Sequence, residues 1–101
     1  MATGRCTLVS NAMVYKVLTD PDTHRATGVL YIDRETREPR ELKAKAVVLC
    51  AQALESARIL FNSANRQDPG GLGNSSGVLG KYLMDHIWVG GGACAEFPDL
   101  A

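Results

Sequence analysis

The 101-residue chain lacks the features that mark several common classes of protein. Its 11 basic and 11 acidic residues cancel, so no excess of positive charge draws it to nucleic acid or to an anionic membrane surface. Its longest apolar stretch, residues 44–54, contains Lys45 and Gln52 and falls far short of the roughly 20 residues of a membrane-spanning helix. The sequence therefore predicts no nucleic-acid partner and no membrane span.

Cysteine and histidine are also scarce. The three cysteines (Cys6, Cys50 and Cys94) are odd in number and no pair has the CxxC spacing, which predicts free thiols in a reducing compartment. The two histidines, His24 and His86, lie too far apart in the sequence to suggest a metal site. No long apolar run follows the first residues, so we expect no signal peptide and a cytoplasmic location.

The first half of the chain predicts a three-stranded β-meander over residues 6–46. We expect a turn at Asp20-Pro21-Asp22-Thr23, because Pro fixes φ and aspartate side chains bond nearby backbone N–H groups, and a second turn in the charged stretch 33–39. In the last strand Leu42, Ala44 and Ala46 alternate with charged residues, so we expect it to be half buried. The expected strands are residues 6–19, 26–32 and 41–46.

The pattern changes at residue 47. Residues 47–51 are uniformly apolar, as in a central strand buried on both faces, and residues 53–64 carry apolar side chains at helical spacing. This order is typical of an α/β fold (α+β within these residues), with residues 1–66 in one domain. Residues 67–101 are expected to form a glycine-rich loop and the truncated start of the following segment. Because one chain with one such strand cannot cover both its faces, we expect an internal piece of a larger protein.

Generic phosphate-binding motifs fail. Gly71-Leu72-Gly73 follows no strand and lacks the third glycine of a dinucleotide-binding loop, and Gly80-Lys81 lacks the Ser or Thr of a P-loop. Glu55 and Arg58 lie three residues apart on the expected helix, and we expect a surface ion pair rather than a functional pair.

Three other stretches share one pattern. They read Arg-Ala-Thr-Gly-Val at 25–29, Val-Val-Leu-Cys-Ala-Gln-Ala-Leu-Glu-Ser-Ala-Arg at 47–58, and Gly-Val-Leu-Gly-Lys-Tyr-Leu-Met-Asp-His at 77–86. In this order and with these gaps they resemble the glucose-methanol-choline (GMC) oxidoreductase family, over roughly residues 5–96. The departures are Leu79 and Lys81 in place of Val and Arg, and Gln52 where the family usually has Gly.

The resemblance implies an FAD-binding, Rossmann-like domain with a meander, leading into a substrate domain. It implies that FAD is the cofactor and that a small alcohol or sugar-type substrate loses a hydride from a CH–OH group to the flavin. The electron acceptor stays open between oxygen, a quinone and a cytochrome.

The resemblance also implies two contacts with the cofactor. Val14 matches the family valine whose backbone bonds the adenine, and the turn of Cys50, Ala51 and Gln52 matches the turn that lies against the adenosine side of FAD. A glutamine in place of glycine either crowds the cofactor or adds a hydrogen bond to it. The family's GxGxxG loop and its C-terminal histidine pair match nothing in this sequence, so we assign no catalytic residue and no metal ligand.

Two alternatives stand beside this interpretation. Another two-domain flavoprotein would share the meander but not Met84-Asp85-His86. A non-catalytic remnant or small binding domain without flavin activity would explain why the glycine loop and the catalytic base are both missing. We expect the isolated chain to bind FAD weakly or not at all.

Overall fold

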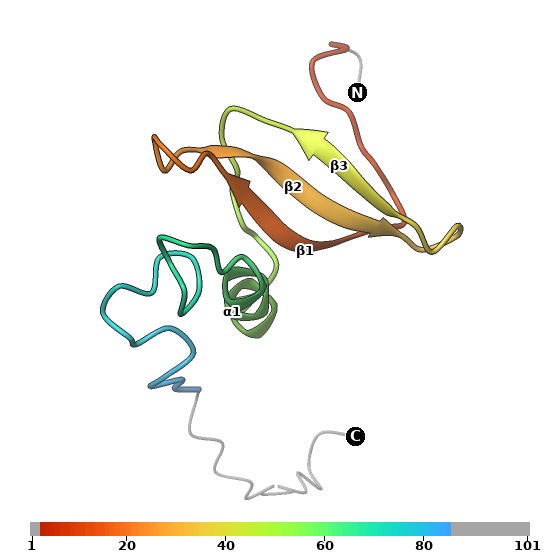
Figure 1. Cartoon of the computed structure of the whole chain (residues 1–101). Coiled ribbons are helices and arrows are strands. Elements are labelled where there is room, and N and C mark those ends of the chain that lie inside the picture. Colours follow the sequence, from red (N-terminus) through yellow and green to blue (C-terminus); the bar gives the residue numbers. More distant parts are fainter. Residues whose placement is uncertain (1–2, 86–101) are drawn as a thin grey trace, which may run out of the picture.

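The computed structural model describes residues 3–85 and shows a three-stranded antiparallel sheet beside one α-helix (Figure 1). The sheet order is β1-β2-β3, so consecutive strands pair as a meander. A small α/β unit, with the meander first and the helix after it, is therefore confirmed. The elements are β1 (Ala12–Thr19), β2 (Ala26–Asp33), β3 (Pro39–Lys43) and α1 (Ala53–Asn62). Within residues 3–85, no helix has the length and apolar character needed to cross a membrane.

Two strands differ in extent from the prediction. β1 starts at Ala12 rather than at residue 6, since Asn11 takes a left-handed conformation (φ 56°) that ends the extended run. β3 covers Pro39–Lys43 rather than 41–46, and all five of its residues are exposed. The expectation of a half-buried third strand is wrong. The helix α1 packs against β1, which is at the other edge of the sheet from β3, so nothing from the helix covers β3.

Residues 47–51 form no strand, contrary to the prediction. They run as extended chain from the end of β3 past the sheet to α1 (Figure 1), and Val48 is 83% exposed. A central strand exists only when strands on both sides accept and donate its backbone hydrogen bonds, and no such neighbour lies among residues 3–85. The apolar side chains of residues 47–51 are of the kind that is usually buried, and the described part of the chain does not bury them fully.

The close approach of β3 to β2 explains the glycine in the Arg-Ala-Thr-Gly-Val stretch, which is Gly28. It lies on β2 opposite Lys43 of β3, and a Cβ atom built on it would come 2.3 Å from the carbonyl oxygen of Leu42. That contact is far inside van der Waals distance, so any side chain at this position would push β3 away from β2.

The helix joins the sheet at the outer edge of β1. Among the described residues the buried hydrophobic side chains are Val17 on β1 and Ile59 on α1. Ser63, immediately after α1, is only 1% exposed, and its Oγ atom donates to the carbonyl of Ile59 (2.6 Å) and accepts from the Val17 N–H (2.8 Å). One buried hydroxyl therefore links the last turn of the helix to the edge strand.

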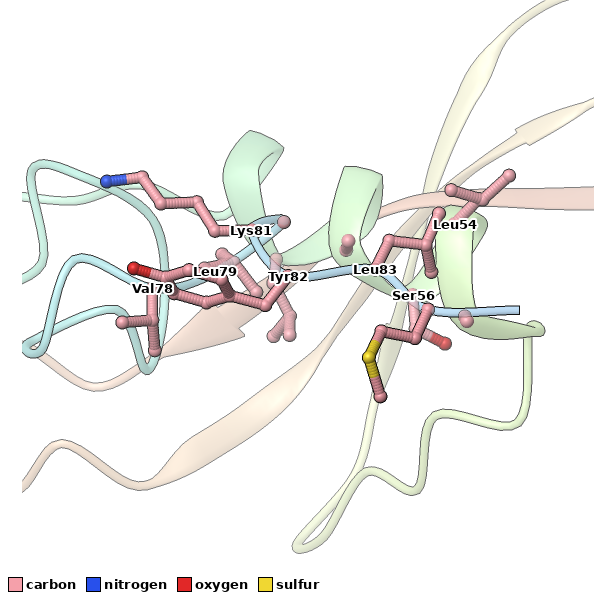
Figure 2. A pocket seen from close by; sticks show the side chains of 12 residues that line it. Leu54, Ser56, Val78, Leu79, Lys81, Tyr82 and Leu83 are labelled. Atoms are coloured by element: carbon pink, nitrogen blue, oxygen red, sulfur yellow. The ribbon is translucent and has the colours of Figure 1, made fainter. Parts of the chain in front are cut away.

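The loop after α1 extends this junction. The Asn65 side chain donates to Thr19 Oγ1 (3.2 Å), and the Gln67 side chain donates to the carbonyl of Pro21. The chain then returns across α1 as residues 78–84, which border an apolar groove with the helix (Figure 2). Gly80 has φ 71° and lies so close to the Phe61 ring that an added Cβ atom would be 2.8 Å from it. Glycine is needed here for both reasons.

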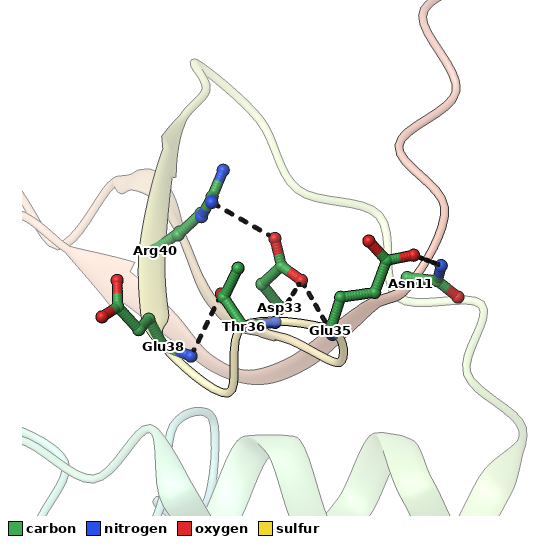
Figure 3. Close-up of polar contacts among 6 residues, drawn as sticks. All are labelled: Asn11, Asp33, Glu35, Thr36, Glu38 and Arg40. Carbon is green, nitrogen blue, oxygen red and sulfur yellow. Dashed lines mark hydrogen bonds and ion pairs between the residues drawn. The ribbon is translucent and has the colours of Figure 1, made fainter.

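The two turns of the meander are built alike. Asp20 accepts hydrogen bonds from the N–H groups of Asp22 and Thr23, and Asp33 accepts from those of Glu35 and Thr36 (Figure 3). These N–H groups hold the pKa of both carboxyl groups below the ordinary aspartate range, with Thr23 contributing most at Asp20 and Glu35 at Asp33. The two expected turns are therefore confirmed, and the backbone bonding expected of aspartate at residue 20 recurs at Asp33.

Replacing Ser63 with Ala should destabilise the protein by about 2 kcal/mol, because the buried Val17 N–H would lose its partner. Urea or guanidinium unfolding measures the change. The control is Ser76→Ala, an exposed turn serine, which should stay within about 0.5 kcal/mol of the parent. Equal stability of the two variants would contradict the role given to Ser63.

Replacing Gly28 with Ala should cost roughly 2 kcal/mol, because the added methyl group overlaps the Leu42 carbonyl. Gly70→Ala is the matched control, since its Cβ atom would meet nothing closer than 3.4 Å. Thermal unfolding compares the pair. A Gly28→Ala protein as stable as the Gly70→Ala protein would show that the close approach of β2 and β3 is not tight in solution.

Candidate cofactor-binding site

Three of the four residues predicted to contact the cofactor border one hollow of about 440 Å³. Val14 contributes from β1, and Cys50 and Ala51 contribute from the extended segment before α1. Val14 precedes Cys50 and Ala51 by more than thirty residues in the sequence, and the path of the chain between β3 and α1 brings them together. The remaining lining is aliphatic and consists of Val29, Leu42, Ala44, residues 46–49 and Ile59.

Two backbone groups of β1 bond to side chains of α1 and of the residue after it rather than to β2. The Val14 carbonyl accepts a hydrogen bond from Arg58 Nη2 (3.4 Å), and the Val17 N–H points the same way, toward Ser63. Polar backbone groups at a strand edge can pair with an adenine, whose exposed edges carry an amine donor and nitrogen acceptors. An apolar hollow with such an edge at its margin fits a flat purine.

An irregularity in β1 lies directly beside Val14. The register of β1 against β2 shifts between Val14 and Lys16, so Tyr15 is an extra residue in the strand. A bulge of this kind twists the strand and re-aims the groups next to it, and bulges recur beside binding sites. No residue in the sequence predicts this bulge, since a bulge depends on how two strands pair.

Gln52 is not part of the lining. It is the N-cap of α1, and its side-chain oxygen accepts a hydrogen bond from the Leu54 N–H (3.0 Å). Its backbone has φ 64° and ψ 163°, a conformation that is essentially restricted to glycine. The glycine that the resemblance predicts at this position would adopt this backbone without strain, and the cap shows what the glutamine side chain does instead of lining the hollow.

The expected ion pair on α1 is confirmed, and it has a third partner. Arg58 donates from Nε (2.9 Å) and Nη2 (2.7 Å) to one carboxylate oxygen of Glu55, and Nη2 also reaches Val14. The hydrogen bond from Arg58 lowers the pKa of the Glu55 carboxyl, and the same bond raises the pKa of Arg58. Sequence spacing predicted the pair, but nothing in the sequence indicated the contact with β1.

Other candidate groups do not gather into a site. Cys6, like Cys50 at the hollow, is an exposed free thiol, and Asp85 is exposed at the end of the described chain. His86 and Cys94 lie outside the described residues. Within residues 3–85, no three His, Cys, Asp or Glu side chains are placed to hold a metal ion.

Comparison with known proteins decides the family. Residues 1–88 match the sequence profile described as GMC oxidoreductase. The chain belongs to the GMC oxidoreductase family. The resemblance carried by its three motifs is therefore confirmed.

Three curated relatives each align with more than half of this chain. A 2-methyl-1,2-propanediol dehydrogenase from Mycolicibacterium austroafricanum is 48% identical over 63 residues, covering 62% of this chain and 11% of the relative. The fructose dehydrogenase large subunit of Gluconobacter japonicus is 33% identical over 98 residues (85% and 18%). A C-glycoside 3-oxidase from Microbacterium trichothecenolyticum is 35% identical over 83 residues (82% and 14%). The chain thus spans less than a fifth of the length of each of these relatives.

Replacing Gln52 with Gly should stabilise the protein by about 1 kcal/mol, because glycine adopts this backbone without strain and still serves as an N-cap. Gln52→Ala should instead destabilise it by about 1 kcal/mol, since the strain stays and the cap is lost. Melting temperatures of the two variants and the parent measure the order. If Gln52→Gly melts as low as Gln52→Ala, the backbone at this position is not strained.

Proposed function

We propose that these residues form the adenosine-facing part of a Rossmann-like, FAD-binding domain in an oxidoreductase that acts on CH–OH groups. One observation carries the proposal: Val14, Cys50 and Ala51 meet at one apolar hollow in a chain whose residues 1–88 match the GMC family. FAD, when bound, supplies the acceptor for the hydride that leaves the substrate.

Each residue has a separate part in binding. The backbone of Val14 pairs with the edge of the adenine, which a strand edge can do without a special side chain. Cys50 and Ala51 are small, so the backbone of the turn can come close to the adenosine. The apolar segment 47–51, of which Val48 and Cys50 are exposed, becomes a buried strand when parallel neighbours of the same sheet flank it.

The substrate is proposed to be a small alcohol or sugar. The named relatives are a propanediol dehydrogenase, a fructose dehydrogenase and a C-glycoside oxidase, and the reactive group common to a diol, fructose and a C-glycoside is a carbon that bears a hydroxyl. Dehydrogenases and an oxidase both occur among these relatives, so they do not favour one electron acceptor.

The test is flavin content of the complete natural protein that contains these residues. We expect FAD at about one per chain, released on denaturation and identified by chromatography. Ala51→Leu should lower FAD affinity at least about tenfold by filling the hollow, while Ala53→Leu, an exposed neighbour outside that lining, should leave it unchanged.

Bleaching of the bound flavin under anaerobic conditions by an alcohol or a sugar would support the proposed reaction. A protein that takes up no flavin would contradict the proposal and would instead support the alternative of a non-catalytic binding domain. An Ala51→Leu protein that binds FAD as tightly as the parent would also contradict the proposal.

A further inference from the structure

The contact between α1 and the sheet contains two different kinds of anchor. At its C-terminal end, Ser63 bonds the Val17 N–H and is buried. One turn earlier, Arg58 bonds the Val14 carbonyl, and its side chain is 39% exposed. Both anchors attach to the outer edge of β1, but only the second attaches to a residue that lines the proposed adenosine site.

The Arg58 anchor is poorly suited to a purely structural task. Its 3.4 Å hydrogen bond to Val14 is long and only partly buried, so it contributes little to stability. The same guanidinium is oriented by two shorter hydrogen bonds to one carboxylate oxygen of Glu55. Glu55 thereby fixes the direction in which the remaining Nη2 hydrogen points, which is toward the Val14 carbonyl.

The position of Val14 makes such an anchor useful. The register of β1 shifts immediately after Val14, so the ladder with β2 constrains the orientation of this peptide less than in regular strand. A carbonyl oxygen has two lone pairs and can accept two hydrogen bonds. A donor fixed on one side of the Val14 oxygen therefore sets where its second lone pair points.

From this geometry we propose that Arg58 is a positioning residue for adenine recognition. Held by Glu55, it orients the Val14 carbonyl so that the second lone pair receives the exocyclic amine of the adenine. Arg58 thereby acts through Val14, and its contribution is selectivity for an amine at this place on the purine. The inference rests on the proposed function, because it presupposes that the adenosine of FAD occupies the hollow.

The experiment uses apoprotein of the complete natural chain and two ligands, FAD and its hypoxanthine analogue, in which a carbonyl group replaces the adenine amine. The parent should bind FAD about tenfold more tightly than the analogue, the preference expected from one charge-supported hydrogen bond. In Arg58→Ala the preference should fall to about twofold or less, through weaker FAD binding with little change for the analogue. Arg58→Lys, which keeps the charge but not the planar fork, should retain an intermediate preference.

Ser63→Ala is the matched control, since it removes the other anchor on β1. It should lower the melting temperature yet keep the parent's preference for FAD over the analogue. Two results would overturn the inference but not the proposed function. One is an Arg58→Ala protein that keeps the parent's preference for FAD, and the other is an Arg58→Ala protein that loses affinity for both ligands equally. A parent protein that binds neither ligand would instead contradict the proposed function.

Discussion

The hydrogen bond between the buried Ser63 hydroxyl and the Val17 N–H is the interaction on which the described structure most depends. Edge strands carry unpaired backbone groups that need partners, and β1 is the edge strand nearest the helix. Arg58 and Ser63 supply partners for the Val14 carbonyl and the Val17 N–H, and Asn65 adds a hydrogen bond to the Thr19 hydroxyl. With Val17 and Ile59 as the buried hydrophobic residues of the described chain, the buried Ser63 bond does most to hold the helix to the sheet.

The same junction determines where a ligand can lie. Because α1 is fixed against β1, the segment leading into α1 must pass beside β1, and this places Cys50 and Ala51 across a hollow from Val14. The strained backbone of Gln52 turns the chain from that segment into the helix. The proposed adenosine site is thus a consequence of how one helix is docked, and it needs no unusual side chain.

The sequence was a good guide wherever local chemistry decides the outcome. The aspartate-centred turns, the start of α1 at Ala53 and the Glu55–Arg58 pair all follow from neighbouring residues. It failed where partners distant in the sequence decide: residues 47–51 are apolar enough for a buried strand, yet they have no strand beside them in the described chain. The bulge at Tyr15 and the capping role of Gln52 likewise depend on pairing and backbone angles that composition does not encode.

Hydrogen–deuterium exchange of the complete natural protein, with and without FAD, tests most directly the claim that β1 and the turn before α1 form one site. FAD should slow exchange in β1 (Ala12–Thr19) and in residues 50–54 together, and should leave the exposed turn at residues 34–38, which lies outside the lining of the hollow, unchanged. Slowed exchange elsewhere with β1 unaffected, or protection of residues 34–38 equal to that of β1, would contradict the account.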